Sequence, residues 1–331
     1  MSNRQRQHET DSGLISFHDW VESICLARYR LACLLLPAAI SSIMKLLPAF
    51  FSLSVLGFCL AADTASPTNF GIKDGSVPED PREAGRGGQF MDFPTWPVSK
   101  ELPNDVFTFA RLRYNSESWG WGRRGGGKWT TDYPDADLNF SYRLQQLTSL
   151  QVSPKGAVVD IDATQMRHYP FIYMIEPGHI SLTGEESKVM REYMMNGGFV
   201  MVDDFWGEEE WETFYMALKQ IFPDREPQEL PLEHEIFHMV FPLKVKPQIP
   251  SVGHAMAGRS QGITAERFDA ETPHYRAVFD DKKRMMMIIC HNTDLGDGWE
   301  EEGTDPWYFR EFSEKYAYPL GINIVFYALT H

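Results

Sequence analysis

Hydrophobic positions after residue 105 follow two alternating patterns, which predict strands and helices in turn. Short apolar runs rich in β-branched and aromatic residues predict buried strands, and they lie at 106–114, 157–161, 171–175, 199–204, 275–280 and 285–290. Apolar residues at helical spacing predict helices at 137–150, 183–196, 208–222 and 320–329, with a further helix start at Asp305-Pro306. This alternation is typical of an α/β fold in which helices cover both faces of a mostly parallel sheet.

Local signals support individual elements of this pattern. Thr183 followed by Glu186 forms a capping box, which predicts a helix start. In the first strand, strict alternation places Phe107, Phe109 and Arg111 on one face of the sheet. Thr108, Ala110 and Leu112 point to the other face, and this alternation suits a first strand.

The N-terminal part of the chain has a different composition. Lys45 is the only charged residue between positions 31 and 62, and from Met44 the chain shows a Met-Lys start, an apolar stretch and small residues before Asp63. This order is typical of a secretory signal peptide. We therefore expect an upstream extension at 1–43 (from a start codon placed too early), a signal peptide at 44–62, a flexible Gly/Pro-rich linker at 63–104 and an α/β domain at 105–331.

These boundaries predict an exported protein, either periplasmic or extracellular. The alternative is an uncleaved transmembrane helix, because the apolar region from 31 to 60 is long enough to span a bilayer. In that case the N-terminal segment would be the only contact of the protein with a membrane.

Composition narrows the classes of partner. The chain has 331 residues, 43% of them hydrophobic, and a formal charge of -15. An acidic chain is poorly suited to nucleic acid, whose phosphates require a basic face. Only Cys290 follows the predicted signal peptide, so the mature part offers neither an internal disulfide nor a cysteine-based zinc site. We assign no metal ion and no cofactor from the sequence.

Polar and aromatic residues gather in three loops that follow predicted strands. In open α/β sheets ligands bind beyond the carboxyl ends of the strands, so these loops are expected to share one cleft. Asp203, Asp204 and His291 are the candidates for catalysis. The candidates for ligand binding are Trp129, Asp132, Asp135, Asp204, Trp206, His291, Asn292 and Asp294. For each residue taken singly a structural role remains open, because loop acids often cap helices or turns.

Residues 234–238 have the sequence HEIFH, the pattern by which a helix presents two zinc-binding imidazoles and a carboxylate base. Two such ligands share one ion only on a helix, because on a strand they would lie about 13 Å apart. Prolines flank the segment, and no third histidine follows at the spacing used by metzincins. A zinc metalloprotease built on His234, Glu235 and His238 is therefore the least favoured function.

Six ordered strings together carry a resemblance: FTFARLRY, TDYPDADLNFSYRL, YPFIYMIEPGH, NGGFVMVDDFWG, HNTDLGDGW and YPLGINIVFYALTH. Over about residues 105–331 the chain resembles the bacterial domain of unknown function 4159 family. The resemblance implies a flavodoxin-like, three-layer fold similar to class I glutamine amidotransferases, and exported or envelope-associated proteins. It implies no established activity.

The resemblance also bears on two motifs. The family pattern has proline after the histidine that corresponds to His234, which implies a non-helical segment there. Amidotransferases of this fold place a nucleophilic cysteine at the position that corresponds to Asp203-Asp204, where this chain has no thiol. Cys290 and His291 are neighbours, so on a strand their side chains point to opposite faces and form no catalytic pair.

Two functions remain open on the sequence alone, and the sequence favours the first. The first is a non-catalytic module of the cell envelope that binds a small molecule, a glycan or an envelope protein. The second is a hydrolase that depends on the cleft acids or on a cation they hold. Carboxylates that lie close together would favour the hydrolase, and exposed tryptophan faces would favour binding. A structural role is suggested only by the segment 63–104.

Overall fold

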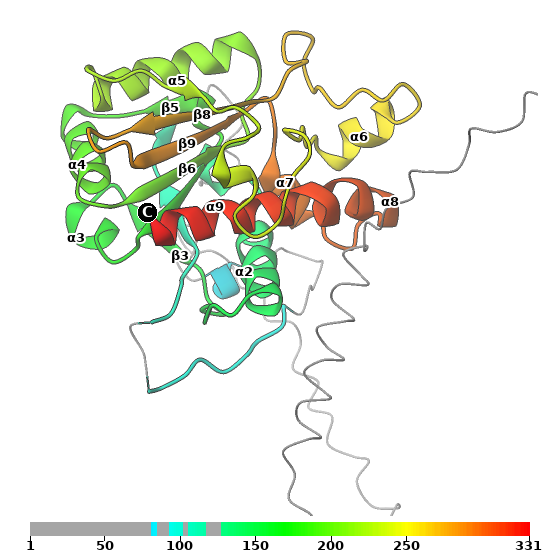
Figure 1. Cartoon of the computed structure of the whole chain (residues 1–331), viewed down its shortest axis with the longest axis horizontal. Helices are drawn as coiled ribbons and strands as arrows, with labels where there is room; N and C mark the ends of the chain where they lie inside the picture. The colour runs from blue at the N-terminus through cyan, green and yellow to red at the C-terminus, as the bar shows by residue number, and fades with distance from the viewer. Residues whose placement is uncertain (1–80, 85–92, 102–104, 117–126) are drawn as a thin grey trace, which may run out of the picture. The chain divides into compact units, whose positions relative to one another are not determined.

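A seven-stranded sheet forms the centre of the protein, with the strand order β3-β1-β4-β6-β9-β8-β7 (Figure 1). The computed structural model describes residues 81–84, 93–101, 105–116 and 127–331, so the predicted upstream extension and signal peptide lie outside the described residues. The strands of the sheet are β1 (Ala110–Arg113), β3 (Ala157–Asp160), β4 (Phe171–Ile175), β6 (Phe199–Asp203), β7 (Gln228–Glu229), β8 (His274–Phe279) and β9 (Met285–His291). A small separate pair consists of β2 (Asn115–Ser116) and β5 (Ile180–Ser181).

The sheet is mostly parallel, as the alternating pattern predicts. β1 pairs in parallel with β3 and β4, β4 pairs with β6, and β6 pairs with β9. β8 and β7 extend the sheet in the antiparallel sense. The short connection from β8 to β9 explains this extension, because a parallel crossover needs a dozen or more residues. The sequence pattern located both late strands but not their antiparallel pairing.

Helices cover both faces of the sheet. The α-helices are α2 (Asp135–Leu147), α3 (Ala163–Met166), α4 (Gly184–Met195), α5 (Gly207–Ile221), α6 (Val252–Gly258), α7 (Leu295–Glu300), α8 (Pro306–Tyr308) and α9 (Tyr318–Thr330). Shorter 3₁₀ turns are η2 (Pro81–Glu83), η3 (Lys128–Thr130), η4 (Pro177–His179) and η5 (Glu235–Phe237), and η6 (Phe309–Ala317) is a π-helix that leads into α9. The predicted capping box at Thr183 and Glu186 is present at the start of α4, and Asp305 caps α8.

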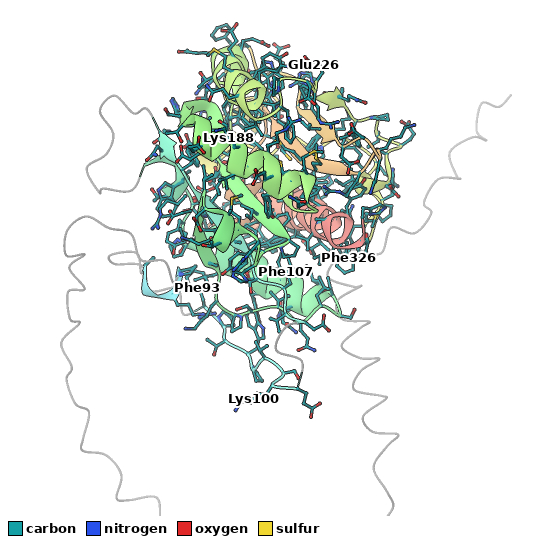
Figure 2. All side chains as sticks on the ribbon, turned by 90° about the vertical axis from the view of Figure 1, so that its left-hand side faces the viewer. Phe93, Lys100, Phe107, Lys188, Glu226 and Phe326 are labelled. Atoms are coloured by element: carbon teal, nitrogen blue, oxygen red, sulfur yellow. The ribbon has the colours of Figure 1, made fainter. Side chains whose placement is uncertain are left out.

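Two apolar clusters fill the space between the sheet and its helices. Alternate residues of β4 point to opposite faces, so Phe171 and Tyr173 join one cluster while Ile172 joins the other. The first cluster also contains residues of α2, α7 and α9, and the second contains residues of α3, α4 and α5. Among the residues that Figure 2 labels, Lys188 lies on α4 and Phe326 on α9, which belong to the two different helix layers. The structure therefore has three layers of helix, sheet and helix.

Two described pieces of the segment 63–104 contact the domain. Arg82 donates from Nε to the Pro154 carbonyl oxygen over 2.7 Å, and Trp96 donates from Nε1 to the Val152 carbonyl oxygen over 2.7 Å. The Trp96 ring also packs on Tyr142 of α2, with ring centroids 5.7 Å apart. These pieces of the expected linker thus bind to the loop between α2 and β3. Among the described residues, no helix is both long enough and apolar enough to cross a bilayer.

A buried ion pair joins β1, the second strand from one edge of the sheet, to helix α2. Both side chains of the Arg111–Asp137 pair are fully buried, and Arg111 Nη2 lies 2.5 Å from Asp137 Oδ1. Burial by itself would lower the pKa of Arg111, but the Asp137 carboxylate more than compensates and the pKa rises above its usual value. Burial also raises the pKa of Asp137, and the charge and hydrogen bonds of Arg111 oppose that rise.

Removing one partner of this pair should destabilise the fold. In Asp137→Asn the Arg111 guanidinium keeps its charge in the core without a counterion, so we expect the free energy of unfolding to fall by about 3–5 kcal/mol. Asp160→Asn is the matched control, because its pair with Arg113 leaves the side chains 31% and 40% exposed. Asp160→Asn should lower the free energy of unfolding by less than about 1 kcal/mol, because exposed ion pairs contribute little. Chemical denaturation of both variants measures the difference, and equal losses would contradict the prediction.

Candidate functional site

Carboxylates from three separate segments converge at the carboxyl edge of the parallel strands. Oxygens of Asp132, Asp204 and Asp294 all lie within 4.8 Å of one another, and we call these three residues the inner group. Oxygens of Asp132, Asp297 and Glu300 satisfy the same limit, and we call these the outer group. Asp132 belongs to both groups. Every member is buried except Glu300, which is half-buried.

Asp132 is held in place by the buried arginine of β1. Arg111 Nη1 donates to the carbonyl oxygens of Trp129 and Thr131, over 3.1 and 2.8 Å, and so fixes the loop that leads into α2. Asp132 itself has a φ of 59° and is 8% exposed. Its Oδ2 atom is buried and has no hydrogen-bond partner among the described residues. A buried polar atom of this kind requires an explanation, because leaving it unsatisfied costs free energy.

Two consecutive aspartates, the last residue of β6 and the residue after it, have different roles. Asp203 Oδ2 accepts hydrogen bonds from the Tyr173 hydroxyl (3.0 Å) and from the backbone N–H groups of Leu295 (2.9 Å) and Gly296 (3.1 Å). Asp203 therefore attaches the N-terminus of α7 to the end of β6. Asp204 has a φ of 55° and accepts a hydrogen bond over 3.1 Å from the Trp206 indole. Its carboxylate is the one that joins the inner group.

Helix α7 and its N-cap supply the remaining acids of the two groups. Asp294 caps the helix by accepting a 2.8 Å hydrogen bond from the Asp297 N–H, and Glu300 is its last residue. Residues spaced by three lie along one side of a helix, so Asp294, Asp297 and Glu300 form a row. Gly296 lies against the cluster: a Cβ atom there would come within 2.5 Å of Asp132 Oδ2. A side chain at position 296 would therefore displace the cluster.

Burial and mutual repulsion act together on the inner group. Burial raises the pKa of Asp204, and the carboxylates of Glu176 and Asp132 raise it further. The pKa of Asp294 is raised by burial and then by Asp204. Burial also raises the pKa of Asp132, where Asp297 adds to the effect and Arg111 opposes it. Acids in this situation either bind protons at neutral pH or share a cation.

The backbone is strained at the same edge of the sheet. Five non-glycine residues of the described chain have positive φ, and four of them lie here: Asp132, Glu176, Asp204 and Asn292. Glu176, Asp204 and Asn292 follow directly on the ends of β4, β6 and β9. Such conformations cost free energy and concentrate at functional sites. The strain thus coincides with the carboxylate groups.

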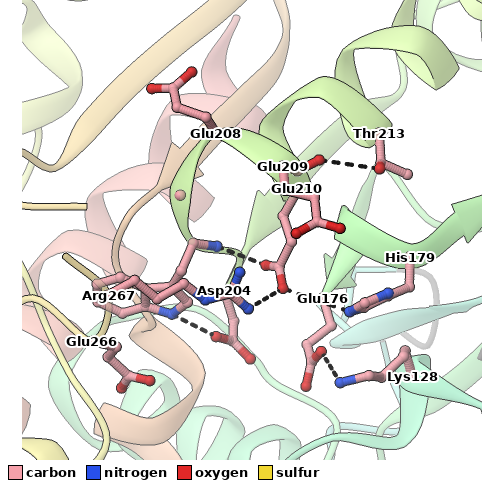
Figure 3. A network of polar contacts seen from close by, with 12 residues as sticks. Lys128, Glu176, His179, Asp204, Glu208, Glu209, Glu210, Thr213, Glu266 and Arg267 are labelled. Carbon is pink, nitrogen blue, oxygen red and sulfur yellow. Dashed lines mark hydrogen bonds and ion pairs between the residues drawn. The ribbon is translucent and has the colours of Figure 1, made fainter. Parts of the chain in front are cut away.

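Ion pairs surround the inner group without neutralising it. Figure 3 shows Asp204 near two of them: Glu210 with Arg267, and Glu176 with Lys128. Glu210 also accepts a 2.8 Å hydrogen bond from the Trp206 N–H. Within the described residues, no Lys, Arg or His forms an ion pair with Asp132, Asp204 or Asp294. The cations near the site are therefore occupied by other acids.

Several residues expected in the cleft have other surroundings. His291 is buried between Phe205 and Trp211, with ring centroids 4.7 and 5.2 Å away. Both of its ring nitrogens are engaged, Nε2 with the Gly207 carbonyl oxygen (3.1 Å) and Nδ1 with Arg276 (3.2 Å). The structure does not bring His291 to the carboxylates, because its side chain points to the helix face occupied by α5.

Other expected ligands also serve the scaffold. Asn292 accepts a 2.9 Å hydrogen bond from the Gly207 N–H and so supports the start of α5. Trp129 and Trp206 are only 5% and 4% exposed, and neither presents an open ring face. Asp135 is buried at the first position of α2 and belongs to neither carboxylate group.

The HEIFH segment does not form an α-helix. Residues Glu235–Phe237 form the 3₁₀ turn η5, whose N-cap His234 accepts a 3.2 Å hydrogen bond from Ile236 N–H through Nδ1. His238 Nε2 pairs with the Leu232 carbonyl oxygen over 2.8 Å. Among the described residues, neither histidine belongs to a group with metal-binding geometry. The helical geometry that a zinc protease requires is absent from this segment.

Two acids near the site were not among the candidates from the sequence. Glu176 follows β4 directly, and the rule that selected Asp204 would have selected it as well. Glu300 could have been found from the spacing of three that links it to Asp297 and Asp294.

An α/β domain with a buried carboxylate cluster at the carboxyl edge of its parallel sheet is therefore the class that the structure defines. Residues 108–329 match the family model described as Domain of unknown function (DUF4159). The chain belongs to this family. No curated protein matches the chain.

Burial of His291 makes the stability of the fold depend on pH. Burial lowers the pKa of His291 from 6.5 to about 4, with smaller effects from Arg276 and His274. The unfolded chain therefore binds a proton between pH 6.5 and 4 that the folded protein excludes, and stability falls as the pH falls through this window. When the pH is lowered from 6.5 to 5, the free energy of unfolding should fall by about 1.5 kcal/mol more in the wild type than in His291→Gln. Denaturation at both pH values measures this.

The control for this experiment is His168→Gln, because His168 is exposed. It should keep the pH dependence of the wild type. Identical pH dependence in the wild type and His291→Gln would show that His291 is not the group responsible.

Close packing at Gly296 leaves no room for a side chain. Gly296→Ala should lower the free energy of unfolding by about 1–3 kcal/mol, because the new methyl group overlaps Asp132 Oδ2. Gly253→Ala is the matched control, since Gly253 is also the second residue of its helix and a Cβ atom there would have nothing within 4 Å. That change should leave stability equal or slightly higher. Thermal unfolding distinguishes the two, and equal effects would contradict the packing argument.

Proposed function

We propose that this domain holds a hard divalent cation in the inner group and functions as a cation-dependent hydrolase. One observation carries the proposal: oxygens of Asp132, Asp204 and Asp294 lie within 4.8 Å of one another in a buried site, and Asp132 Oδ2 has no partner among the described residues. A cation at this position would satisfy that oxygen and relieve the repulsion among the three acids.

The donor atoms favour particular ions. Both carboxylate groups offer oxygen ligands only, without histidine or cysteine. Oxygen ligands suit Mg²⁺, Ca²⁺ and Mn²⁺, whereas zinc prefers nitrogen and sulfur. We therefore propose one of these three ions rather than zinc.

The position of the group favours catalysis over a purely structural ion. The acids lie beyond the ends of parallel strands, where α/β proteins bind ligands, and the backbone is strained at the same place. A bound cation lowers the pKa of a coordinated water and so generates a nucleophile near neutral pH. Non-catalytic ligand binding through tryptophan faces is less favoured, because Trp129 and Trp206 are buried.

The finer fold class is part of the same proposal. Numbered by themselves in chain order, the five parallel strands β1, β3, β4, β6 and β9 have the order 2-1-3-4-5, which is the flavodoxin-like order. The turn from β6 to α5 carries the strained residue Asp204 where amidotransferases of this type carry their nucleophile. Cys290 cannot replace that nucleophile, because it is fully buried and burial raises the pKa of its thiol.

Export of the protein is a further part of the proposal. Its support is the Met-Lys start, apolar stretch and small residues at 44–62. An exported domain would meet divalent cations and envelope substrates outside the cytoplasm.

Cation binding provides the direct test. Titration of the full chain with Mg²⁺, Ca²⁺ and Mn²⁺, followed by thermal unfolding and calorimetry, should show stabilisation by at least one ion. The free energy of unfolding should rise by about 2.7 kcal/mol at a cation concentration 100 times the dissociation constant. Asp204→Asn should abolish this gain, because it removes a charged ligand from the inner group.

Asp281→Asn is the control, because the Asp281 side chain is 82% exposed and pairs with Arg225 rather than with the cluster. It should respond to cations as the wild type does. Hydrolysis of nitrophenyl phosphate and carboxylate esters with and without a chelator then tests catalysis. A wild type that no divalent cation stabilises would refute the proposal.

A further inference from the structure

The inner and outer carboxylate groups share one residue, Asp132, which could therefore contact an ion in each group. Asp132 has two carboxylate oxygens and belongs to both the inner and the outer group. A carboxylate can therefore contribute one oxygen to each of two neighbouring ions. Sites with two metal ions hold them about 3.5–4 Å apart.

The row of acids on α7 fits such a spacing. Asp294, Asp297 and Glu300 follow one another at intervals of three residues, which corresponds to about 4.5 Å along a helix axis. Asp294 contributes to the inner group, whereas Asp297 and Glu300 contribute to the outer group. The two groups are thus displaced along α7 by about one such interval.

Charge also favours two ions. The two groups contain five different carboxylates, with a formal charge of -5 when all are ionised. One divalent cation would leave -3, and two would leave -1. The buried Arg111 already balances Asp137. A single ion would leave most of the repulsion in place.

The two positions differ in exposure. All three residues of the inner group are buried, while Glu300 of the outer group is half-buried. An ion in the outer position would therefore lie nearer to solvent and exchange more readily.

We propose that a second divalent cation binds the outer group, with Asp132 bridging the two ions. This inference rests on the proposed function, because it assumes an ion in the inner group. The inner ion is bound tightly and organises the site. The outer ion is the more exchangeable one, and its solvent side is where an anionic ligand, such as a phosphate ester, would bind.

Binding stoichiometry tests the proposal. Calorimetric titration of the full chain with Mn²⁺ should give two ions per chain, and the electron paramagnetic resonance spectrum of the loaded protein should show coupling between two Mn²⁺ ions. Glu300→Gln should bind one ion and lose the coupling, with outer affinity reduced about 10–100-fold or more. Asp132→Asn should lose both ions, since it removes the bridging charge.

Glu301→Gln is the matched control, because Glu301 adjoins Glu300 but belongs to neither group. It should bind two coupled ions. One ion in the wild type would refute the second position and leave the proposed function intact, whereas no ion would refute both. Two ions in Glu300→Gln, or two uncoupled ions in the wild type, would also refute the shared site.

Discussion

The buried Arg111–Asp137 ion pair is the interaction on which the arrangement of the site depends. A guanidinium can be placed in a protein core only with a counterion and with acceptors for its remaining N–H groups. Asp137 supplies the counterion from α2, and the carbonyl oxygens of Trp129 and Thr131 supply further acceptors. These bonds connect strand β1 to the first turn of α2 and fix the loop between them. Asp132 follows Thr131 in that loop, so the hydrogen bonds from Arg111 to the loop carbonyl oxygens also fix the position of Asp132.

The opposite side of the site is fixed by a different carboxylate. Asp203 accepts hydrogen bonds from Tyr173 and from the first backbone N–H groups of α7. The same α7 carries Asp294, Asp297 and Glu300. Asp137 and Asp203 belong to neither carboxylate group, and each positions a segment that carries acids of these groups. Asp137 pairs with Arg111, and Asp203 Oδ2 accepts three hydrogen bonds, while Asp203 Oδ1 has no partner among the described residues.

Such a cluster is costly for a protein to maintain. Burial and repulsion raise the pKa values of its acids, and strained backbone adds to the cost at Asp132 and Asp204. Interactions of this kind are retained where they serve a function, since apolar residues of similar size would be more stable. Divalent cations would offset the repulsion, and a pair of ions would do so more completely than one.

Local patterns determined the elements and the α/β class, and they placed three of the clustered acids in loops at one edge of the sheet. The apolar runs and the capping signals located the strands and helices because both arise from contacts between residues close in sequence. Asp132, Asp204 and Asp294 could be grouped in advance because the carboxyl ends of parallel strands meet at one edge. His291 shows the limit of that rule. His291 lies at the same edge as the last residue of β9, but its position in the alternation of that strand directs the side chain toward α5 and Phe205.

Tertiary structure alone decided which acids act together. The sequence could not show that Asp137 would form an ion pair with Arg111, or that Asp203 would accept hydrogen bonds from the N-terminus of α7. It also could not show that Asp132 would belong to both carboxylate groups. Each of these outcomes depends on contacts between segments far apart in the chain. Periodicity records only which face of an element is apolar, and the partner that the face meets is set when the whole domain packs.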